Sequence, residues 1–158
     1  MPVIYKTNFA SGAQPMPTPS GSEVISVRMP YAVPAAGFKI GDYVVAGYLP
    51  AGCVPVDWYV DSGGLDSGNG LTLDVGIFED DYSVISTEAE DGGGKWVAAA
   101  TVARAGGFLR NASIYAGVCP VDDTIDRPVG FMAAAATTTG VAGTLALTLL
   151  YRAAYQGA

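Results

Sequence analysis

Carboxylates are the side chains whose spacing in this sequence comes closest to a chemical site. Asp57, Asp61, Asp66 and Asp74 flank one glycine-rich loop, and Asp61, Asp66 and Asn69 among these residues could supply oxygen ligands to calcium. Their spacing matches neither the alternate-residue pattern of an EF-hand loop nor a repeated glycine-aspartate nonapeptide. Aspartates in turns commonly accept hydrogen bonds from the backbone two residues further on. We therefore interpret these aspartates as turn residues and predict no metal site and no cofactor.

A second acidic cluster consists of Asp122, Asp123 and Asp126, with Arg127 beside them. Paired carboxylates perform acid–base catalysis in glycosidases. Here they share one short loop and have no aromatic platform near them in the sequence. The interpretation that we favour is a solvated loop, or an ion pair with Arg127 or with a neighbouring subunit.

The remaining nucleophiles lack the partners that catalysis requires. The chain contains no histidine, and its serines and threonines are not set in a G-x-S-x-G elbow. Gly92 to Lys95 is weakly similar to a phosphate-binding loop, but the P-loop spacing is absent and Trp96 follows where serine or threonine is needed. Cys53 and Cys119 are read as buried free thiols. We predict that the protein is not an enzyme, and we assign no catalytic residue.

Composition limits the partners of the chain. Its 158 residues correspond to one domain, and its net charge of −7 argues against binding to nucleic acid. The longest apolar run, near Val141 to Leu150, is broken and too short to span a bilayer, so we expect no membrane partner. The N-terminus does not read as a secretory signal, which predicts synthesis in a reducing cytoplasm. A low charged fraction of 15% together with 50% hydrophobic residues favours an oligomer or a larger partner.

The stretch from Ala51 to Phe78 shows most clearly which elements carry these side chains. Both of its halves alternate apolar and other residues, as a strand does when one of its faces lies in a core. Between them, residues 62–70 are turn-forming throughout. We predict two long antiparallel strands of one sheet. The residues expected in the core are Val54, Val56, Trp58 and Val60 in the first half and Leu71, Leu73, Val75 and Ile77 in the second.

The rest of the chain reads as further short strands separated by turns. With 21 glycines and 10 prolines, this pattern predicts an all-β fold, an antiparallel β-sandwich or jelly-roll-like domain covering residues 22–158. One or two helical turns are plausible between Trp96 and Arg104. The other strands are expected at 23–31, 43–49, 82–87, 109–118, 129–136 and 143–152.

Residues 1–21 are predicted to form an extended N-terminal arm. Three prolines between positions 15 and 19 favour an extended course without sheet pairing. A frayed terminus is the simpler alternative. The arm nevertheless carries Tyr5, Phe9 and Met16, apolar side chains that so short a stretch cannot bury by itself, and such an arm often lies across a neighbouring subunit.

Three segments together resemble a known family. They are Y-K-T-N-F near the N-terminus, P-A-G-C-V-P-V-D-W-Y-V-D-S-G-G-L-D-S-G running into L-T-L-D-V-G-I-F, and G-T-L-A-L-T-L-L-Y-R-A near the end; D-R-P-V-G at 126–130 fits as well. The chain resembles the head decoration or cement proteins of tailed bacteriophages, which lie beside the major capsid protein. The resemblance covers most of the chain from Tyr5 to Ala153 and rests on the character and order of these segments.

The resemblance implies a β-sandwich or jelly-roll-like protein, often a homotrimer, seated on the exterior of the virion capsid. Its expected partners are the major capsid protein and further copies of itself. Candidate residues for the capsid or subunit interface are Tyr5, Lys6, Phe9 and Met16 in the arm, together with Trp96. Two alternatives stay open: a head fibre or tail structural component, and a carbohydrate-binding β-sandwich module that uses Trp96 and exposed tyrosines as its platform.

Overall fold

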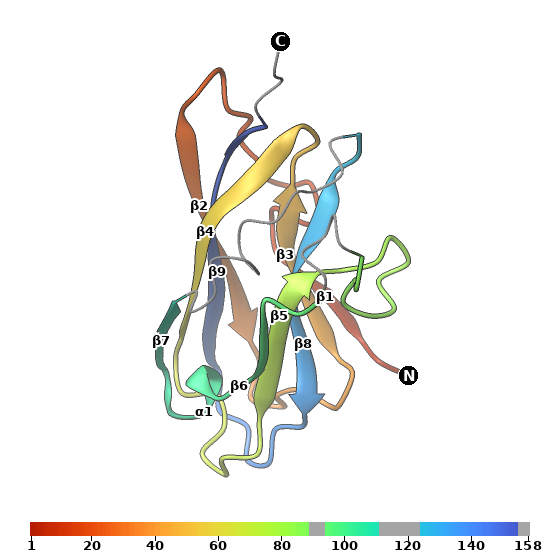
Figure 1. Cartoon of the computed structure of the whole chain (residues 1–158). Helices are drawn as coiled ribbons and strands as arrows, with labels where there is room; N and C mark the ends of the chain where they lie inside the picture. Colours follow the sequence, from red (N-terminus) through yellow and green to blue (C-terminus); the bar gives the residue numbers. More distant parts are fainter. Residues whose placement is uncertain (89–93, 111–123, 155–158) are drawn as a thin grey trace.

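The computed structural model describes residues 1–88, 94–110 and 124–154, and these residues form a β-sandwich (Figure 1). One sheet has five strands in the order β1-β3-β8-β5-β6, and the other has four in the order β2-β9-β4-β7. The five-stranded sheet contains β1 (Ile4–Lys6), β3 (Tyr43–Leu49), β8 (Arg127–Ala135), β5 (Thr72–Ile77) and β6 (Val97–Ala100). The four-stranded sheet contains β2 (Val24–Val33), β9 (Gly143–Ala153), β4 (Cys53–Ser62) and β7 (Gly107–Arg110).

The predicted all-β sandwich is confirmed, and its strand pairs are antiparallel except for β1, which runs parallel to β3. The helix α1 (Val102–Ala105) is a single turn. Among the described residues, no helix is long and apolar enough to cross a membrane.

The alternating apolar side chains of β9 form the centre of the core, as the sequence predicted. β9 lies between β2 and β4, so its inward row meets side chains from both neighbouring strands. The inward side chains are completely buried: Leu145, Leu147, Leu149 and Tyr151.

The five-stranded sheet has apolar side chains on both faces, which explains the unbroken apolar character of β3. Val44 and Ala46 face the sandwich core, whereas Tyr43 and Val45 belong to a smaller cluster with Phe78. Strands covered on both sides read as continuous hydrophobic runs. The face of the five-stranded sheet that points away from the sandwich core is therefore also covered by packed apolar side chains.

The prediction that the two halves of Ala51 to Phe78 pair with each other was wrong. β4 belongs to the four-stranded sheet and β5 to the five-stranded sheet. Their apolar rows face each other across one core. Alternation shows which face of a strand is buried but not which strand lies beside it. The loop between them is long enough to cross the roughly 10 Å that separates packed sheets.

A β-bulge also changes which side chains of β4 enter the core. The register against β9 shifts between Pro55 and Asp57, so that Val56 is the extra residue. Trp58 and Val60 are buried as predicted, but Val54 and Val56 are only half-buried. Cys53 and Pro55 take their expected places on the buried face.

Three other elements differ from their prediction. The expected strand at 82–87 is a loop with one bridge between Phe78 and Ile85. The region from Trp96 to Arg104 contains β6 before the single helical turn. The strand predicted at 109–118 corresponds to β7 only at its start, because residues 111–123 lie outside the described residues, and Cys119, Asp122 and Asp123 with them.

Candidate interaction surfaces around the N-terminal segment

In this chain the first 20 residues, which we call the N-terminal segment, contact the chain's own sandwich. These contacts begin in the turn that follows β1. The hydroxyl of Thr7 donates to the carbonyl of Ala46, and the amide of Ala10 donates to the Thr7 hydroxyl at 3.2 Å. The Thr7 amide donates to the carbonyl of Val45 at 3.2 Å. Thr7 is 4% exposed, so these bonds satisfy a buried polar side chain and fix the start of the segment.

Phe9 and Met16 occupy space that a glycine leaves open in β3. A Cβ atom at Gly47 would lie 2.4 Å from the sulfur of Met29, 3.2 Å from the sulfur of Met16 and 3.5 Å from the Cβ of Phe9. Phe9 is 8% exposed and belongs to the main core, with Met16 partly buried against it. The N-terminal segment thus closes one region of the sandwich core.

Two tyrosine hydroxyls of the sandwich donate hydrogen bonds to the N-terminal segment. Tyr48 donates to the carbonyl of Ala10 at 3.3 Å, and Tyr151 donates to the carbonyl of Pro17. Burial, then the hydrogen bond with Tyr82, raises the pKa of Tyr48 to about 12. Burial also raises the pKa of Tyr151 to about 12. Both phenols therefore keep the proton that they donate at neutral pH.

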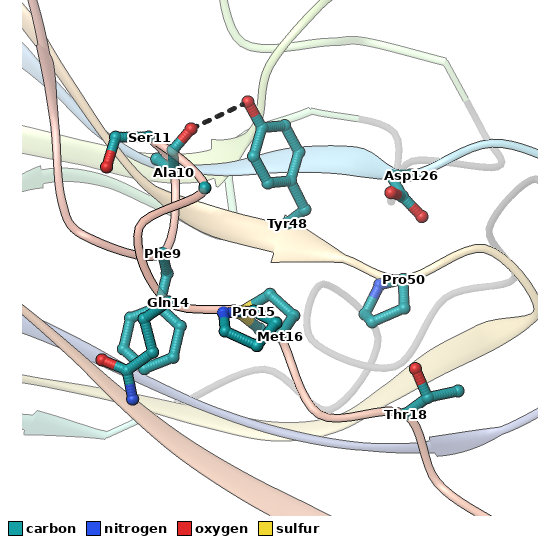
Figure 2. A pocket seen from close by; sticks show the side chains of 11 residues that line it. Phe9, Ala10, Ser11, Gln14, Pro15, Met16, Thr18, Tyr48, Pro50 and Asp126 are labelled. Carbon is teal, nitrogen blue, oxygen red and sulfur yellow. Dashed lines mark hydrogen bonds between the residues drawn. The ribbon is translucent and has the colours of Figure 1, made fainter.

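An open groove of roughly 440 Å³ runs between the N-terminal segment and the end of β3, as Figure 2 shows. We call it the N-terminal groove. Asp126 at its rim accepts a hydrogen bond of 2.8 Å from the Ala51 amide, which fixes the carboxylate. The residues lining it are mostly small, apolar or uncharged: Phe9, Ala10, Ser11, Gly12, Gln14, Pro15, Met16, Thr18, Tyr48, Pro50 and Asp126. This lining suits contact with a protein surface better than it suits catalysis.

A tyrosine pair extends this surface onto the outer face of the five-stranded sheet. The hydroxyls of Tyr48 and Tyr82 lie 3.1 Å apart, and the Nζ atom of Lys6 lies 5.4 Å from the centre of the Tyr82 ring. A cation at this distance is attracted by the face of the ring. Lys6 is exposed, so its ammonium remains open to a partner.

The residues predicted for an interface fall into two groups. Tyr5, Lys6, Phe9 and Met16 all belong to the N-terminal segment; Tyr5 is half-buried and its ring contacts Tyr31 and Phe38. Trp96 stands apart from them: it is 5% exposed and stacks on Trp58 with ring centres 6.0 Å apart. The interface role of all five residues stays a prediction.

The aspartates around the predicted loop have partners within the chain. Asp66 is completely buried and accepts five backbone hydrogen bonds of 2.7 to 3.1 Å. Burial alone raises the pKa of its carboxyl, but the hydrogen bonds from Thr139, Thr138, Leu71 and Gly70 outweigh burial and hold that pKa well below its usual range. The turn-capping interpretation is therefore the one that the geometry supports for this residue.

Of the other three aspartates that flank the loop, Asp74 is buried and lies 2.6 Å from the Lys95 ammonium, whereas Asp57 and Asp61 form ion pairs at the surface. Asp61 accepts two hydrogen bonds from Arg28, of 3.1 and 2.6 Å, and Asp57 lies 3.2 Å from Arg110. Within the described ranges, no three Cys, Asp or Glu side chains gather in a way that could hold a metal ion.

Tyr48, Tyr82 and Asp126 are parts of this surface that the sequence alone does not reveal. Tyr48 lies in a strand that reads as uniformly apolar, and its neighbours Ala10 and Tyr82 are more than 30 residues away. The one available signal was the polar tip of tyrosine in such a strand, because a buried hydroxyl needs a partner. In the sequence, Asp126 reads as part of an acidic loop that is solvated or pairs with Arg127 or with a neighbouring subunit.

A chain of the capsid of Ralstonia phage GP4 superposes with a TM-score of 0.79 and 30% identity, covering 98% of this chain and 100% of that one. A chain of the capsid asymmetric unit of cyanophage Pam1 superposes with a TM-score of 0.61 and 15% identity, covering 90% and 96%. The second likeness shows the fold alone. No protein-family model matches the sequence, and no curated protein matches it.

Proposed function

This chain belongs to the same family as the matched chain of the Ralstonia phage GP4 capsid, and on that premise we propose that it is a decoration or cement protein. In this role it binds the outer surface of a phage capsid, stabilises the shell and has no enzymatic activity. The observation that carries the proposal is 30% identity over 98% of this chain and the whole of that chain. Its partners are the major capsid protein and, in a homotrimer, further copies of itself.

Binding to an assembled lattice provides the mechanism of stabilisation. A protein that binds the assembled shell better than its free subunits shifts the equilibrium toward the shell. A trimer that contacts several subunits at once gains further through multivalency, even if each contact is weak. The proposed site of action is the virion exterior, after synthesis in the host cytoplasm.

The N-terminal segment is the part that we propose to face the capsid. Lys6 is exposed, and Tyr5 and Met16 are half-buried, so each of them still presents surface to a partner. Phe9 itself lies in the core, and its packing there fixes the position of the segment. Trp96 is buried against Trp58, so the carbohydrate-binding alternative loses the tryptophan of its expected platform.

Shells of the parent phage made without this chain provide the test. The purified protein is added to these shells, bound copies are counted after sedimentation, and the temperature at which the shells open is measured with and without it. We expect saturable binding and a higher opening temperature. Binding confined to a single vertex or to tails would instead identify a head fibre or tail component. Absence of binding to any shell would contradict the proposal.

A further inference from the structure

The four-stranded sheet ends on one side at β2, which is a long edge strand. β2 pairs with β9 over ten consecutive residues without a register shift, from Val24 to Val33. The edge strands of the five-stranded sheet are much shorter, since β1 has three residues and β6 has four. A long, flat edge strand presents a row of backbone groups that pair readily with another chain. The free edge of β2 is therefore where this fold can accept a further strand.

The hydrogen bonds of the sheet show which backbone groups of β2 point away from β9. The Gly63 amide, directly after β4, donates to the Thr144 carbonyl of β9 at 2.9 Å. Even-numbered residues of β9 thus bond toward β4 and odd-numbered ones toward β2, because successive residues direct their backbone groups to opposite sides. The register pairs odd-numbered residues of β9 with odd-numbered residues of β2. The outward residues of β2 are therefore the even-numbered ones: Val24, Ser26, Arg28, Pro30 and Ala32.

The backbone groups of these outward residues are free to bind another strand. All five residues are exposed, and within the described ranges no hydrogen bond occupies their outward groups. Pro30 agrees with this assignment, because a proline in a sheet is confined to positions where its missing N–H faces solvent. Outward residues follow one another at about 6.8 Å, twice the rise of about 3.4 Å per residue. Another extended backbone has the spacing that matches this row.

The N-terminal segment borders the same edge. The Tyr5 ring lies 5.6 Å from the ring of Tyr31 in β2. An open groove of roughly 380 Å³ separates the segment from the end of β2. Residues of both line it: Lys6, Thr7, Asn8, Pro30, Tyr31, Ala32 and Thr144. Edge and segment form one continuous surface, so a strand added to β2 comes from the partner that the segment faces.

A second copy of β2 fits this edge poorly. Two-fold pairing brings Pro30 from both copies, so every antiparallel register that joins four or more outward residues loses two hydrogen bonds. In the longest of these registers the two Arg28 side chains lie opposite each other, which is unfavourable. Each copy also carries a net charge of −7, and copies of like charge repel. A strand of a different protein meets Pro30 once or not at all.

We propose that β2 takes up an extended segment of the major capsid protein, which becomes a fifth strand of the four-stranded sheet. This inference rests on the proposed function and names the chemistry of its contact. The incoming segment spans about five residues, pairs with the free amides of Val24, Ser26 and Arg28, and has no proline at the positions that pair with them. Main-chain hydrogen bonds supply the affinity, so the segment is recognised by its extended backbone more than by its side chains.

A proline in the free edge tests this contact. Ser26→Pro removes an outward amide, yet it keeps the bonds between β2 and β9, because even-numbered residues of β2 do not bond to β9. Ser26→Ala is the matched control, since it loses the same hydroxyl and keeps the amide. We expect Ser26→Ala to bind shells as the wild type does and Ser26→Pro to bind at least about tenfold more weakly, with similar melts. Equal binding of two folded variants would overturn the proposal.

Hydrogen exchange of the wild type tests the contact without any substitution. The protein is labelled free and on shells, released under quench, and read residue by residue by electron-transfer mass spectrometry. We expect the amides of Val24, Ser26 and Arg28 to exchange at least about tenfold more slowly on shells, whereas Val27 and Met29, bonded to β9, are slow in both states. Unchanged exchange on shells would overturn the proposal. Slowing that grows with the concentration of free protein would identify a second copy as the occupant and would also overturn it.

Binding of the wild type to shells separates this inference from the proposed function. If the wild type binds and Ser26→Pro binds equally well, the decoration role is retained and the added strand is removed. If the wild type binds no shell, both the decoration role and the added strand are removed.

Discussion

The Oδ1 atom of Asp66 accepts a hydrogen bond of 2.7 Å from the backbone amide of Thr139, which lies 73 residues further along the chain. The other carboxylate oxygen of Asp66 accepts bonds from the amides of Gly70, Leu71 and Thr138. One buried side chain therefore joins the loop that leads from β4 to β5 with the loop that leads from β8 to β9.

We expect Asp66→Asn to lower the thermal midpoint more than any exposed Asp→Asn change. The amide side chain has a single oxygen acceptor and introduces two donors, so it leaves backbone amides of the two loops unpaired. Asp80→Asn is the matched control, because Asp80 is exposed. Equal midpoints for the two variants in circular dichroism melts would show that the five bonds contribute nothing.

The Asp66 carboxylate also makes the stability of the protein depend on pH in the acid range. Folding holds the pKa of Asp66 below its ordinary value of 3.8, so its contribution is complete above that pH and is lost as pH falls toward the folded value. Urea unfolding of the wild type and Asp66→Asn between about pH 5 and pH 2 measures this effect. We expect the difference between their free energies of unfolding to shrink as pH falls. A difference that stays constant would show that this carboxylate has an ordinary pKa.

Alkaline pH is expected to release the N-terminal segment. Tyr48 and Tyr151 donate to the segment, and their pKa values are raised to about 12 from 10.0, so their stabilisation is complete below pH 10 and is lost as pH rises toward 12. The ¹³C methyl signal of Met16 reports the release without depending on amide exchange. A Tyr151→Phe variant should show part of the change already at neutral pH. A wild-type signal that is unchanged at pH 12 would contradict the prediction.

Gly130→Ala is expected to destabilise the protein by more than about 3 kcal/mol, because overpacking against backbone cannot be relieved by a rotamer change. A Cβ atom at Gly130 would lie 1.9 Å from the carbonyl oxygen of Val44. Gly63→Ala is the control: its new Cβ meets nothing closer than 3.8 Å, and its cost should be about 1 kcal/mol or less. Chemical denaturation measures both variants. A Gly130→Ala protein as stable as Gly63→Ala would contradict the strand spacing described here.

Two substitutions in the N-terminal segment separate its packing from its proposed contact with the capsid. Phe9→Ala removes a core side chain and should cost roughly 3–5 kcal/mol. Lys6→Ala removes an exposed ammonium and should change stability by no more than about 0.5 kcal/mol. We expect Lys6→Ala to weaken binding to shells while leaving the melt unchanged. Wild-type affinity of Lys6→Ala for shells would remove Lys6 from the proposed interface.

The parts of the fold that the sequence predicted are those where a local pattern is sufficient. β3 begins and ends where expected, and β9 buries its alternating leucines, because one strand's burial follows from its own period of two. The pairing of β4 and β5 was wrong because the choice of partner depends on residues elsewhere in the chain. The bulge at Val56 also leaves Val54 and Val56 half-buried where full burial was expected, since one extra residue changes which face of the strand the residues on either side of it occupy.

The N-terminal surface was harder to predict because its contacts are remote in sequence. Four of the five candidate interface residues do lie in one segment, but nothing local indicates that Phe9 enters the core. That burial depends on the missing side chain at Gly47, which is 38 positions later in the chain. The tyrosine hydroxyls that hold the segment are also contributed by distant strands.

The central place of β9 affects how the protein is made. Among the described strands β9 comes last in sequence, yet it lies between β2 and β4, which are complete many residues earlier. On the ribosome, β2 and β4 therefore emerge without the strand that joins them, and their apolar rows stay uncovered until β9 has emerged as well. The four-stranded sheet cannot form before that point, and the nascent chain depends on fast completion or on chaperones to avoid aggregation.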